Sequence, residues 1–227
     1  MMRFFLSLLS AMMLVSTTAA ADHGVRIGLK GGVNFSEVDR STPPEETTYG
    51  QRTGYGAGME LDVLASPAVC FALDLLYLQK GVEARATYVE GSDIEGREIY
   101  IDTNTRLDYL VFAPMIRFTA ARGGFAPYVQ FGGEVGYLLE ASDSSESYRD
   151  GSEDRLTYEG DAGARYHEFD FGVCFGGGFE IPAGSYALFF EGRYSLGLSD
   201  IGEPAEGSTT TIEQKNRGIY VFGGLRF

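Results

Sequence analysis

The sequence contains no tryptophan, and it has only two cysteines, Cys70 and Cys174, and two histidines, His23 and His167. Two cysteines allow at most one disulfide. Cys70 begins one predicted strand just after a turn and Cys174 lies in the middle of another, so we expect their Cα atoms to be too far apart to be bridged. No set of zinc ligands with the usual spacing is present. We therefore predict two free cysteines and no metal site.

Long apolar runs are also missing, apart from one near the N-terminus. Residues 4–15 are apolar, follow Arg3 and precede small residues at 19–21, which is the pattern of a cleaved secretory signal. The run is shorter than the roughly 20 residues that a membrane-spanning helix needs. We predict a signal peptide at residues 1–21 and a single domain at residues 22–227, which would have to use β-strands to enter a membrane.

Motifs for nucleotides and ions are absent as well. The chain has no P-loop and no dinucleotide fingerprint, so we expect no cofactor. The acidic stretch at residues 143–161 lacks the D-x-[DN]-x-[DN]-G pattern of an EF-hand, and a solvated loop is the better interpretation of it. The 32 acidic residues outnumber the 18 basic ones and give a net charge of −14, which disfavours nucleic acid as a partner.

The sequence does have a strict alternation of apolar and polar side chains. In residues 165–198, bulky apolar residues such as Phe171 and Val173 alternate with acidic, glycine and small residues such as Asp170 and Gly172. A period of two is that of a β-strand, because a helix would mix the two sets. This segment is therefore predicted to be a β-hairpin with one apolar face and one polar face, as in the wall of a membrane barrel.

The same alternation predicts eight strands. The first two lie at about residues 25–36 and 52–65, and the last at residues 217–227. The third and fourth strands continue beyond any bilayer thickness and form a protruding hairpin at residues 81–105. In the fourth strand, Pro114 cannot donate to the ladder and suggests a local bulge.

The connections between these strands alternate between long and short. The long ones are residues 37–51, 81–105, 141–164 and 199–215. Bacterial outer-membrane barrels have an even number of antiparallel strands, short periplasmic turns and longer external loops. We therefore predict an all-β fold in the bacterial outer membrane: an eight-stranded antiparallel up-and-down transmembrane β-barrel with four long external loops and three short periplasmic turns. Its aromatic belt must consist of Tyr and Phe.

The acidic charge is concentrated in the long loops. Counted without Arg3, the four loops together carry −15, whereas the strands and turns are neutral. The interior of an eight-stranded barrel is only wide enough for its own side chains, and unpaired charges there are costly. We therefore predict a filled lumen in which opposite charges pair. The predicted lumen charge network consists of Lys30, Glu60, Asp62, Asp74, Lys80, Arg117, Glu134, Asp170, Glu180, Glu191, Arg193 and Arg226.

The C-terminal strand carries a second signal. Phe227 and Leu225 share one strand face with other apolar residues, and this arrangement resembles the terminal-strand signal that the outer-membrane assembly machinery reads. We therefore expect that machinery to be a partner during insertion.

Four segments resemble a known family. They are GLKGGVNFS (28–36), ALDLLYLQKGVE (72–83), DYLVFAPMIRF (108–118) and FFEGRYSLGLSDI (189–201). In order and spacing they resemble the outer-membrane β-barrel domain family that includes PorT-like proteins. Asp74 stands where the family pattern has glutamate, which keeps the charge. The resemblance implies an outer-membrane barrel, and it carries neither a catalytic motif nor a ligand.

An enzyme that hydrolyses lipids or peptides would need a nucleophile and a base. His167 is predicted at the external rim near Glu168 and Asp170, with Ser199 as the neighbouring hydroxyl. A rim histidine is more often an interfacial polar residue than part of a triad. We therefore expect no enzyme.

Three functions fit these features. The first is a monomeric, non-enzymatic barrel with a structural or interaction and adhesion role, whose acidic loops contact a protein partner, outer-membrane lipid or lipopolysaccharide, with divalent cations as a loose bridge. The second is a narrow channel for ions or small solutes. The third is a soluble lipocalin-like binding barrel, whose apolar faces would point inward around a ligand.

Overall fold

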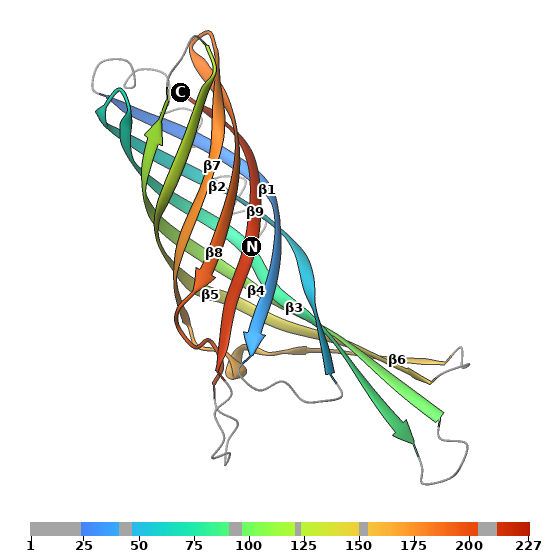
Figure 1. Ribbon diagram of the computed structural model, residues 1–227. Helices are drawn as coiled ribbons and strands as arrows, with labels where there is room; N and C mark the ends of the chain where they lie inside the picture. Colours follow the sequence, from blue (N-terminus) through green and yellow to red (C-terminus); the bar gives the residue numbers. More distant parts are fainter. Residues whose placement is uncertain (1–23, 41–46, 91–96, 121–123, 150–153, 204–212) are drawn as a thin grey trace, which may run out of the picture.

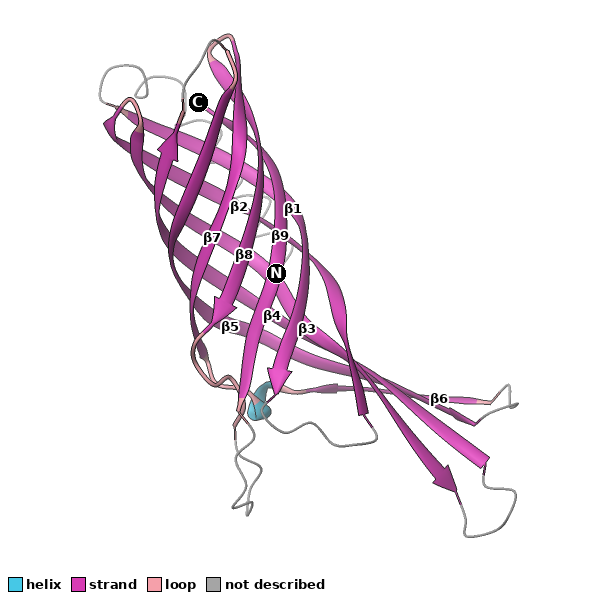
Figure 2. Ribbon diagram, viewed as in Figure 1, coloured by secondary structure: helices cyan, strands magenta, loops and turns pink. Residues whose placement is uncertain are grey.

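The computed structural model describes residues 24–40, 47–90, 97–120, 124–149, 154–203 and 213–227. The predicted signal peptide, residues 1–21, lies outside the described residues. Nearly all regular structure in the described part is β-strand (Figure 2). No helix among these residues is long and apolar enough to cross a membrane.

Nine strands and one short helix are described. They are β1 Val25–Arg40, β2 Thr47–Ser66, β3 Val69–Glu90, β4 Arg97–Thr119, β5 Ala126–Arg149, β6 Arg155–Asp161, the 3-10 helix η1 Gly163–Arg165, β7 Phe169–Ala183, β8 Tyr186–Gly197 and β9 Gln214–Arg226. Eight of the strands form a ring in the order β4-β3-β2-β1-β9-β8-β7-β5, which the β4–β5 pairing closes. All neighbours in the ring are antiparallel (Figure 1). The predicted eight-stranded up-and-down barrel is confirmed, and β6 lies outside the ring.

The two faces of the barrel wall differ as the alternation predicts. On β7, Phe169 and Phe171 expose about half of their surface, at 49% and 50%. Asp170, which lies between them, and Cys174, further along the same strand, each expose 2%. An outward row of large apolar side chains would be unfavourable in water, but a bilayer covers it. The inward rows of the barrel carry the buried charges beside a smaller apolar cluster that includes Leu76, Leu107 and Phe222. Because the exposed row of large apolar side chains faces outward, the alternative of a lipocalin-like barrel with its apolar faces inside is wrong.

The C-terminal residue closes the seam between the first and last strands. The N–H of Phe227 donates to the carbonyl of Ile27 at 2.8 Å, and the N–H of Ile27 donates back at 3.3 Å. These bonds extend the β1–β9 ladder, which begins at the Gly28 and Arg226 pair. Phe227 therefore belongs to the wall as well as to the predicted assembly signal.

The segment at residues 141–164, predicted to be a loop, is largely strand. β5 continues to Arg149, and β6 folds back to pair with it between Ser142 and Tyr148. Serine and acidic residues dominate the segment, so it lacks the polarity contrast by which a strand is recognised. Pairing with β4 nevertheless satisfies its backbone groups.

Pro114 does not produce the expected bulge. It lies opposite Leu73 of β3, and the register between β4 and β5 is the same on both sides of it. The register shift between these two strands occurs further along, at Asp108 and Tyr109. Proline removes one ladder hydrogen bond, and the wall accommodates that loss without an inserted residue.

Beyond the barrel rim, three barrel strands continue and are joined by β6 in one antiparallel sheet, which we call the external sheet. It consists of residues 82–90 of β3, 97–105 of β4, 142–149 of β5 and the whole of β6. Residues 47–51 of β2 pair with the other side of β3. Figure 1 shows the β3–β4 and β5–β6 hairpins leaving the barrel on the same side and pointing away from it.

Gly81 marks the place where β3 leaves the wall. Its φ of +139° is one that residues with a side chain rarely adopt. A Cβ at this position would also run into the carbonyl oxygen of Thr105. The register between β2 and β3 shifts across this point, between Gln51 and Gly56. Glycine is therefore required where the external sheet begins.

Candidate functional site

Charged side chains fill much of the barrel interior, next to a buried apolar cluster around Leu78 and Tyr109. Eleven of the twelve residues in the predicted lumen charge network are buried, with exposed fractions of 4% or less. The twelfth, Glu180, lies nearer the short turns, and 13% of its side chain is exposed. Register brings these residues together from strands that are far apart in the sequence, and they form two clusters.

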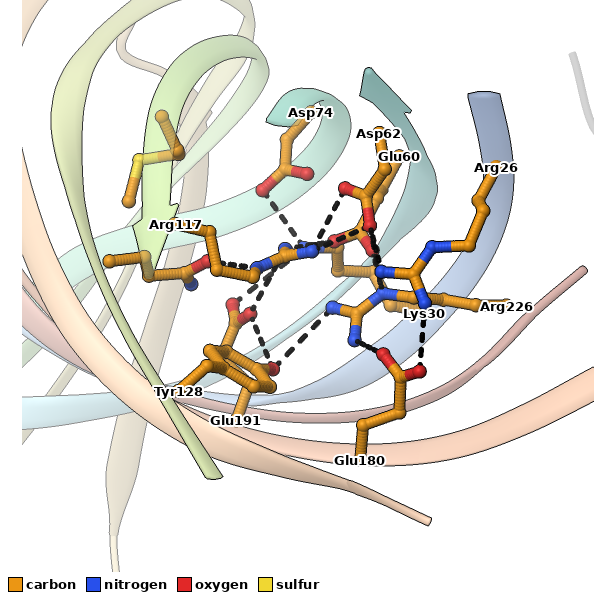
Figure 3. A network of polar contacts seen from close by, with 12 residues as sticks. Arg26, Lys30, Glu60, Asp62, Asp74, Arg117, Tyr128, Glu180, Glu191 and Arg226 are labelled. Atoms are coloured by element: carbon orange, nitrogen blue, oxygen red, sulfur yellow. Dashed lines mark hydrogen bonds and ion pairs between the residues drawn. The ribbon is translucent and has the colours of Figure 1, made fainter. Parts of the chain in front are cut away.

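The main cluster surrounds Lys30, and Figure 3 shows much of it. The Lys30 ammonium lies 2.9 Å from Glu60, 2.9 Å from Asp74 and 3.6 Å from Glu191. Arg193 bridges the last two carboxylates, at 2.6 Å from Asp74 and 2.7 Å from Glu191. Two cations therefore share the same two acids.

Two further arginines complete the main cluster. Arg117 lies 2.7 Å from Asp62 and 2.9 Å from Glu60. Arg226 pairs with Glu60 as well, and lies 2.8 Å from Glu180. Glu60 thus contacts three cations, counting Lys30. Such sharing compensates the cost of burying the carboxylate, which a single partner does only with excellent geometry.

Aromatic rings enclose the two arginines. The Arg117 guanidinium lies 4.9 Å from the centre of the Tyr128 ring, and that of Arg226 lies 3.9 Å from the Phe189 ring. The Tyr128 hydroxyl also donates to Glu191 at 3.1 Å. Arginine stacks favourably on aromatic faces in desolvated sites. The lumen is therefore held by packing as well as by ion pairs.

Arg26 and Tyr128 also belong to the main cluster, although neither was in the predicted network. Arg26 lies 2.8 Å from Glu180 and 3.1 Å from Asp62, and with it the main cluster contains five basic and five acidic side chains. Both missed residues lie on the polar parity of their strands. That parity was the available signal, although a strand terminus and an aromatic ring obscured it.

The second cluster lies nearer the external rim and surrounds Lys80. Its ammonium is 2.9 Å from Glu134 and 3.0 Å from Asp170. The Ser195 hydroxyl donates to Glu134 at 2.6 Å, and the Asn216 amide donates to Asp170 at 2.9 Å. One cation faces two carboxylates here, so neutral donors supply the remaining contacts.

The arrangement of both clusters favours a closed interior. Side chains lining a water-filled channel remain accessible to solvent, whereas the ion-paired ends here are almost completely inaccessible, including Arg117 and Arg193 at 1% of their side chains. An eight-stranded ring has room for little more than its own side chains. The lumen thus has the properties of a plug.

A cavity of about 980 Å³ opens at the external mouth, where β4, β5 and η1 meet. Its lining carries both signs of charge, including Arg52, Arg106 and Glu168. Asp143, also in the lining, already accepts from Thr105 at 2.7 Å and pairs with Arg165. Five carboxylates and two arginines line the cavity, so its lining is predominantly acidic.

The residues considered for catalysis do not form a relay. His167 pairs with Glu203 at 2.6 Å. The Ser199 hydroxyl instead donates to Asp170 at 3.3 Å and accepts from the N–H of Phe171 at 2.8 Å. No hydrogen bond between His167 and Ser199 occurs among these described contacts.

The cysteines and acidic groups form neither a disulfide nor a metal site in the part of the chain that the structure describes. Cys70 and Cys174 are both free and buried, as predicted. The Cys174 thiol lies 3.2 Å from the Met115 sulfur. Across the described ranges, no group of three or more His, Cys, Asp or Glu residues is arranged to hold a metal ion.

Comparisons with known proteins agree with the fold. The family described as outer membrane protein beta-barrel domain matches residues 14–203. Among solved structures, OprG from Pseudomonas aeruginosa is 12% identical over 90% of this chain and 97% of its own, with a TM-score of 0.43. Neisserial surface protein A is 11% identical over 89% and 96%, with a TM-score of 0.40. Ail from Yersinia pestis is 9% identical over 89% and 98%, with a TM-score of 0.36.

A search of curated proteins finds no match to this chain. The family match covers most of the chain and establishes the membership.

Proposed function

The chain belongs to the outer membrane protein beta-barrel domain family, and we propose that it is a non-enzymatic barrel with an interaction or adhesion role. In this proposal the filled lumen serves as a rigid scaffold, and recognition takes place outside the membrane. The four matching segments favour a place among the PorT-like members. Outer-membrane lipid, lipopolysaccharide and the assembly machinery are the expected partners.

The observation that carries the proposal is the contrast between the closed barrel interior and the exposed external sheet. Inside the wall, charged side chains such as Lys30 and Arg193 are buried and paired. Outside it, the strands continue well beyond the rim as the external sheet, where Tyr88, Leu156 and Tyr158 are exposed by 48%, 76% and 68%. An interior closed by ion pairs suits a support, while an extended, exposed sheet suits contact with another surface.

The alternative is a narrow channel for ions or small solutes. Several buried polar atoms near the second cluster, including one carboxylate oxygen of Glu134 and the amide oxygen of Asn216, have no protein partner. Water at those atoms would wet part of the lumen. The main cluster would still block a continuous path.

Planar-bilayer recording separates the two functions. Purified protein, shown to be folded by its heat-dependent shift on gels, is inserted into the bilayer, and we expect no steady conductance. Steady single-channel steps would overturn the closed lumen and support the channel. As a matched control, the double variant Arg117→Ser and Glu60→Ser removes one large ion pair and should raise conductance if insertion is efficient.

A further inference from the structure

The strand β6 forms a free edge of the external sheet. It pairs with β5 alone and ends the strand order. Along its other side, no strand in the described part of the chain accepts or donates ladder hydrogen bonds. An exposed edge of this kind is a template for a further strand.

The apolar side chains of β6 are unusually exposed for this molecule. Leu156 and Tyr158 expose 76% and 68% of their surface, more than any other large apolar residue that the structure describes as exposed. Most of the others lie on the barrel wall, where lipid covers them. β6 lies outside the ring, so lipid does not account for its apolar pair.

The opposite face of β6 carries charges of both signs. Arg155 and Glu159 are exposed and alternate with the apolar pair. The Arg155 guanidinium lies 2.9 Å from Glu146 and 5.1 Å from the centre of the Tyr148 ring, both on β5. The Arg155 side chain is still 58% exposed, so Glu159 of another chain can approach it from the free edge.

These features make the strand complementary to itself. When two β6 strands are placed antiparallel with Thr157 opposite Thr157, each Leu156 lies opposite a Tyr158, and each Arg155 lies opposite a Glu159. Residues directly opposite on antiparallel strands have Cβ atoms about 4.5–5.5 Å apart, close enough to contact. The interface then contains two Leu156–Tyr158 contacts and two Arg155–Glu159 ion pairs, related by the two-fold axis. Such a repeated, self-complementary set of contacts is what a two-fold interface requires.

We propose that two copies of this protein associate edge to edge through β6, so that their external sheets join across a two-fold axis at Thr157. The acidic loops repel a second copy in general, and the two Arg155 and Glu159 pairs offset that repulsion locally. The inference deepens the proposed interaction role by naming the partner, and it rests on that role. It differs from the monomer expected from the sequence.

Cysteine cross-linking in outer-membrane preparations tests the register. In Thr157→Cys the two thiols face each other on the axis, so mild oxidation should produce a dimer on non-reducing gels. Leu156→Cys or Tyr158→Cys alone should not, since identical residues are offset by two positions, about 7 Å along the strand, which places the Cα atoms beyond bridging distance. Co-expressed Leu156→Cys and Tyr158→Cys chains should cross-link to each other.

Two controls sharpen the test. Tyr88→Cys, on the β3–β4 hairpin and 48% exposed, reports random collision, and the buried Cys70 and Cys174 should stay reduced. Arg155→Glu in the Thr157→Cys background should reduce the dimer at least tenfold, and adding Glu159→Arg should restore it.

The proposal is overturned if Thr157→Cys remains monomeric, if all four positions cross-link equally, or if the product contains a different protein. A heat-shift gel confirms that each variant is folded. The conductance experiment is independent of β6, so a failure of the dimer leaves the closed lumen standing.

Discussion

Replacing Lys80 by methionine is expected to be one of the most damaging single changes in the barrel. Lys80 is the cation of the second cluster, with its ammonium 2.9 Å from Glu134 and 3.0 Å from Asp170. All three side chains are 3% exposed or less. Methionine retains the length of the side chain and removes its charge, so two buried carboxylates lose the cation between them.

The magnitude follows from the distances. At an effective dielectric constant of about 20, a contact near 3 Å contributes about 5.5 kcal/mol of attraction, and Lys80 makes two. The substitution also removes the cost of burying the ammonium, which is several kcal/mol. Leaving a buried charge without its partner typically costs a net 3–5 kcal/mol, and we expect the free energy of unfolding to fall by about that amount.

A triple variant provides the matched control. Adding Glu134→Gln and Asp170→Asn to Lys80→Met removes the two stranded charges and retains oxygens that accept from Ser195 and Asn216. We expect this variant to recover at least half of the lost stability.

Urea titration of the protein refolded in lipid vesicles measures the difference, followed by circular dichroism and gel shift because the chain has no tryptophan. If the free energy of unfolding of Lys80→Met is within about 1 kcal/mol of that of the wild type, the loss is well below the usual cost of breaking a buried ion pair. In that case the charge-pair reasoning is wrong. It is equally wrong if the triple variant is no more stable than the single one.

Three further outcomes are expected. Hydrogen bonding to Arg85 holds the pKa of Asp102 in the external sheet below its ordinary value of 3.8. The pair therefore stabilises the β3–β4 hairpin above about pH 4, and this stabilisation is lost as the pH falls through the depressed pKa. Hydrogen exchange between pH 6 and pH 2 should show the hairpin loosening only at the acidic end, and Asp102→Asn should abolish that change. Gly81→Ala should lower the free energy of unfolding in the urea titration by at least about 1–3 kcal/mol, because a φ of +139° strains the backbone by that much and the added Cβ also meets the carbonyl oxygen of Thr105. Gly192→Ala, with no atom within 4 Å, should cost less, and equal costs for the two variants would contradict this reasoning. Phe227→Ala retains the backbone bonds of the seam but removes the ring of the assembly signal, so it should reduce the folded fraction in the outer membrane while leaving refolding in vesicles unchanged; normal insertion would sink that role.

The barrel wall was predictable because its two environments are so different. Lipid outside and a crowded polar interior impose opposite preferences on successive residues, and residues 165–198 express them at almost every position. β7 and β8 accordingly lie within the predicted hairpin. The location of the strands therefore needs no knowledge of their partners.

The pairing of individual charges was not predictable in the same way. Alternation places Lys30 and Asp74 on the inner face, but it does not indicate that their atoms meet at 2.9 Å. That meeting depends on the register of β1, β2 and β3 and on the stagger around the ring. Arg26 was left out of the network for a related reason: it lies at the start of β1, and its partners Asp62 and Glu180 are 36 and 154 residues away in the sequence.

β6 was missed because its strand conformation depends on a neighbour. None of its seven residues is buried, so no hydrophobic face distinguishes RLTYEGD from a solvated acidic loop. It becomes a strand because the extension of β5 offers an open edge, and pairing satisfies the backbone groups on one side only. Because β6 pairs with β5 on one side only, its other side becomes the new open edge of the sheet. The absence of burial that conceals this strand in the sequence is therefore also what leaves Leu156 and Tyr158 available to a second copy.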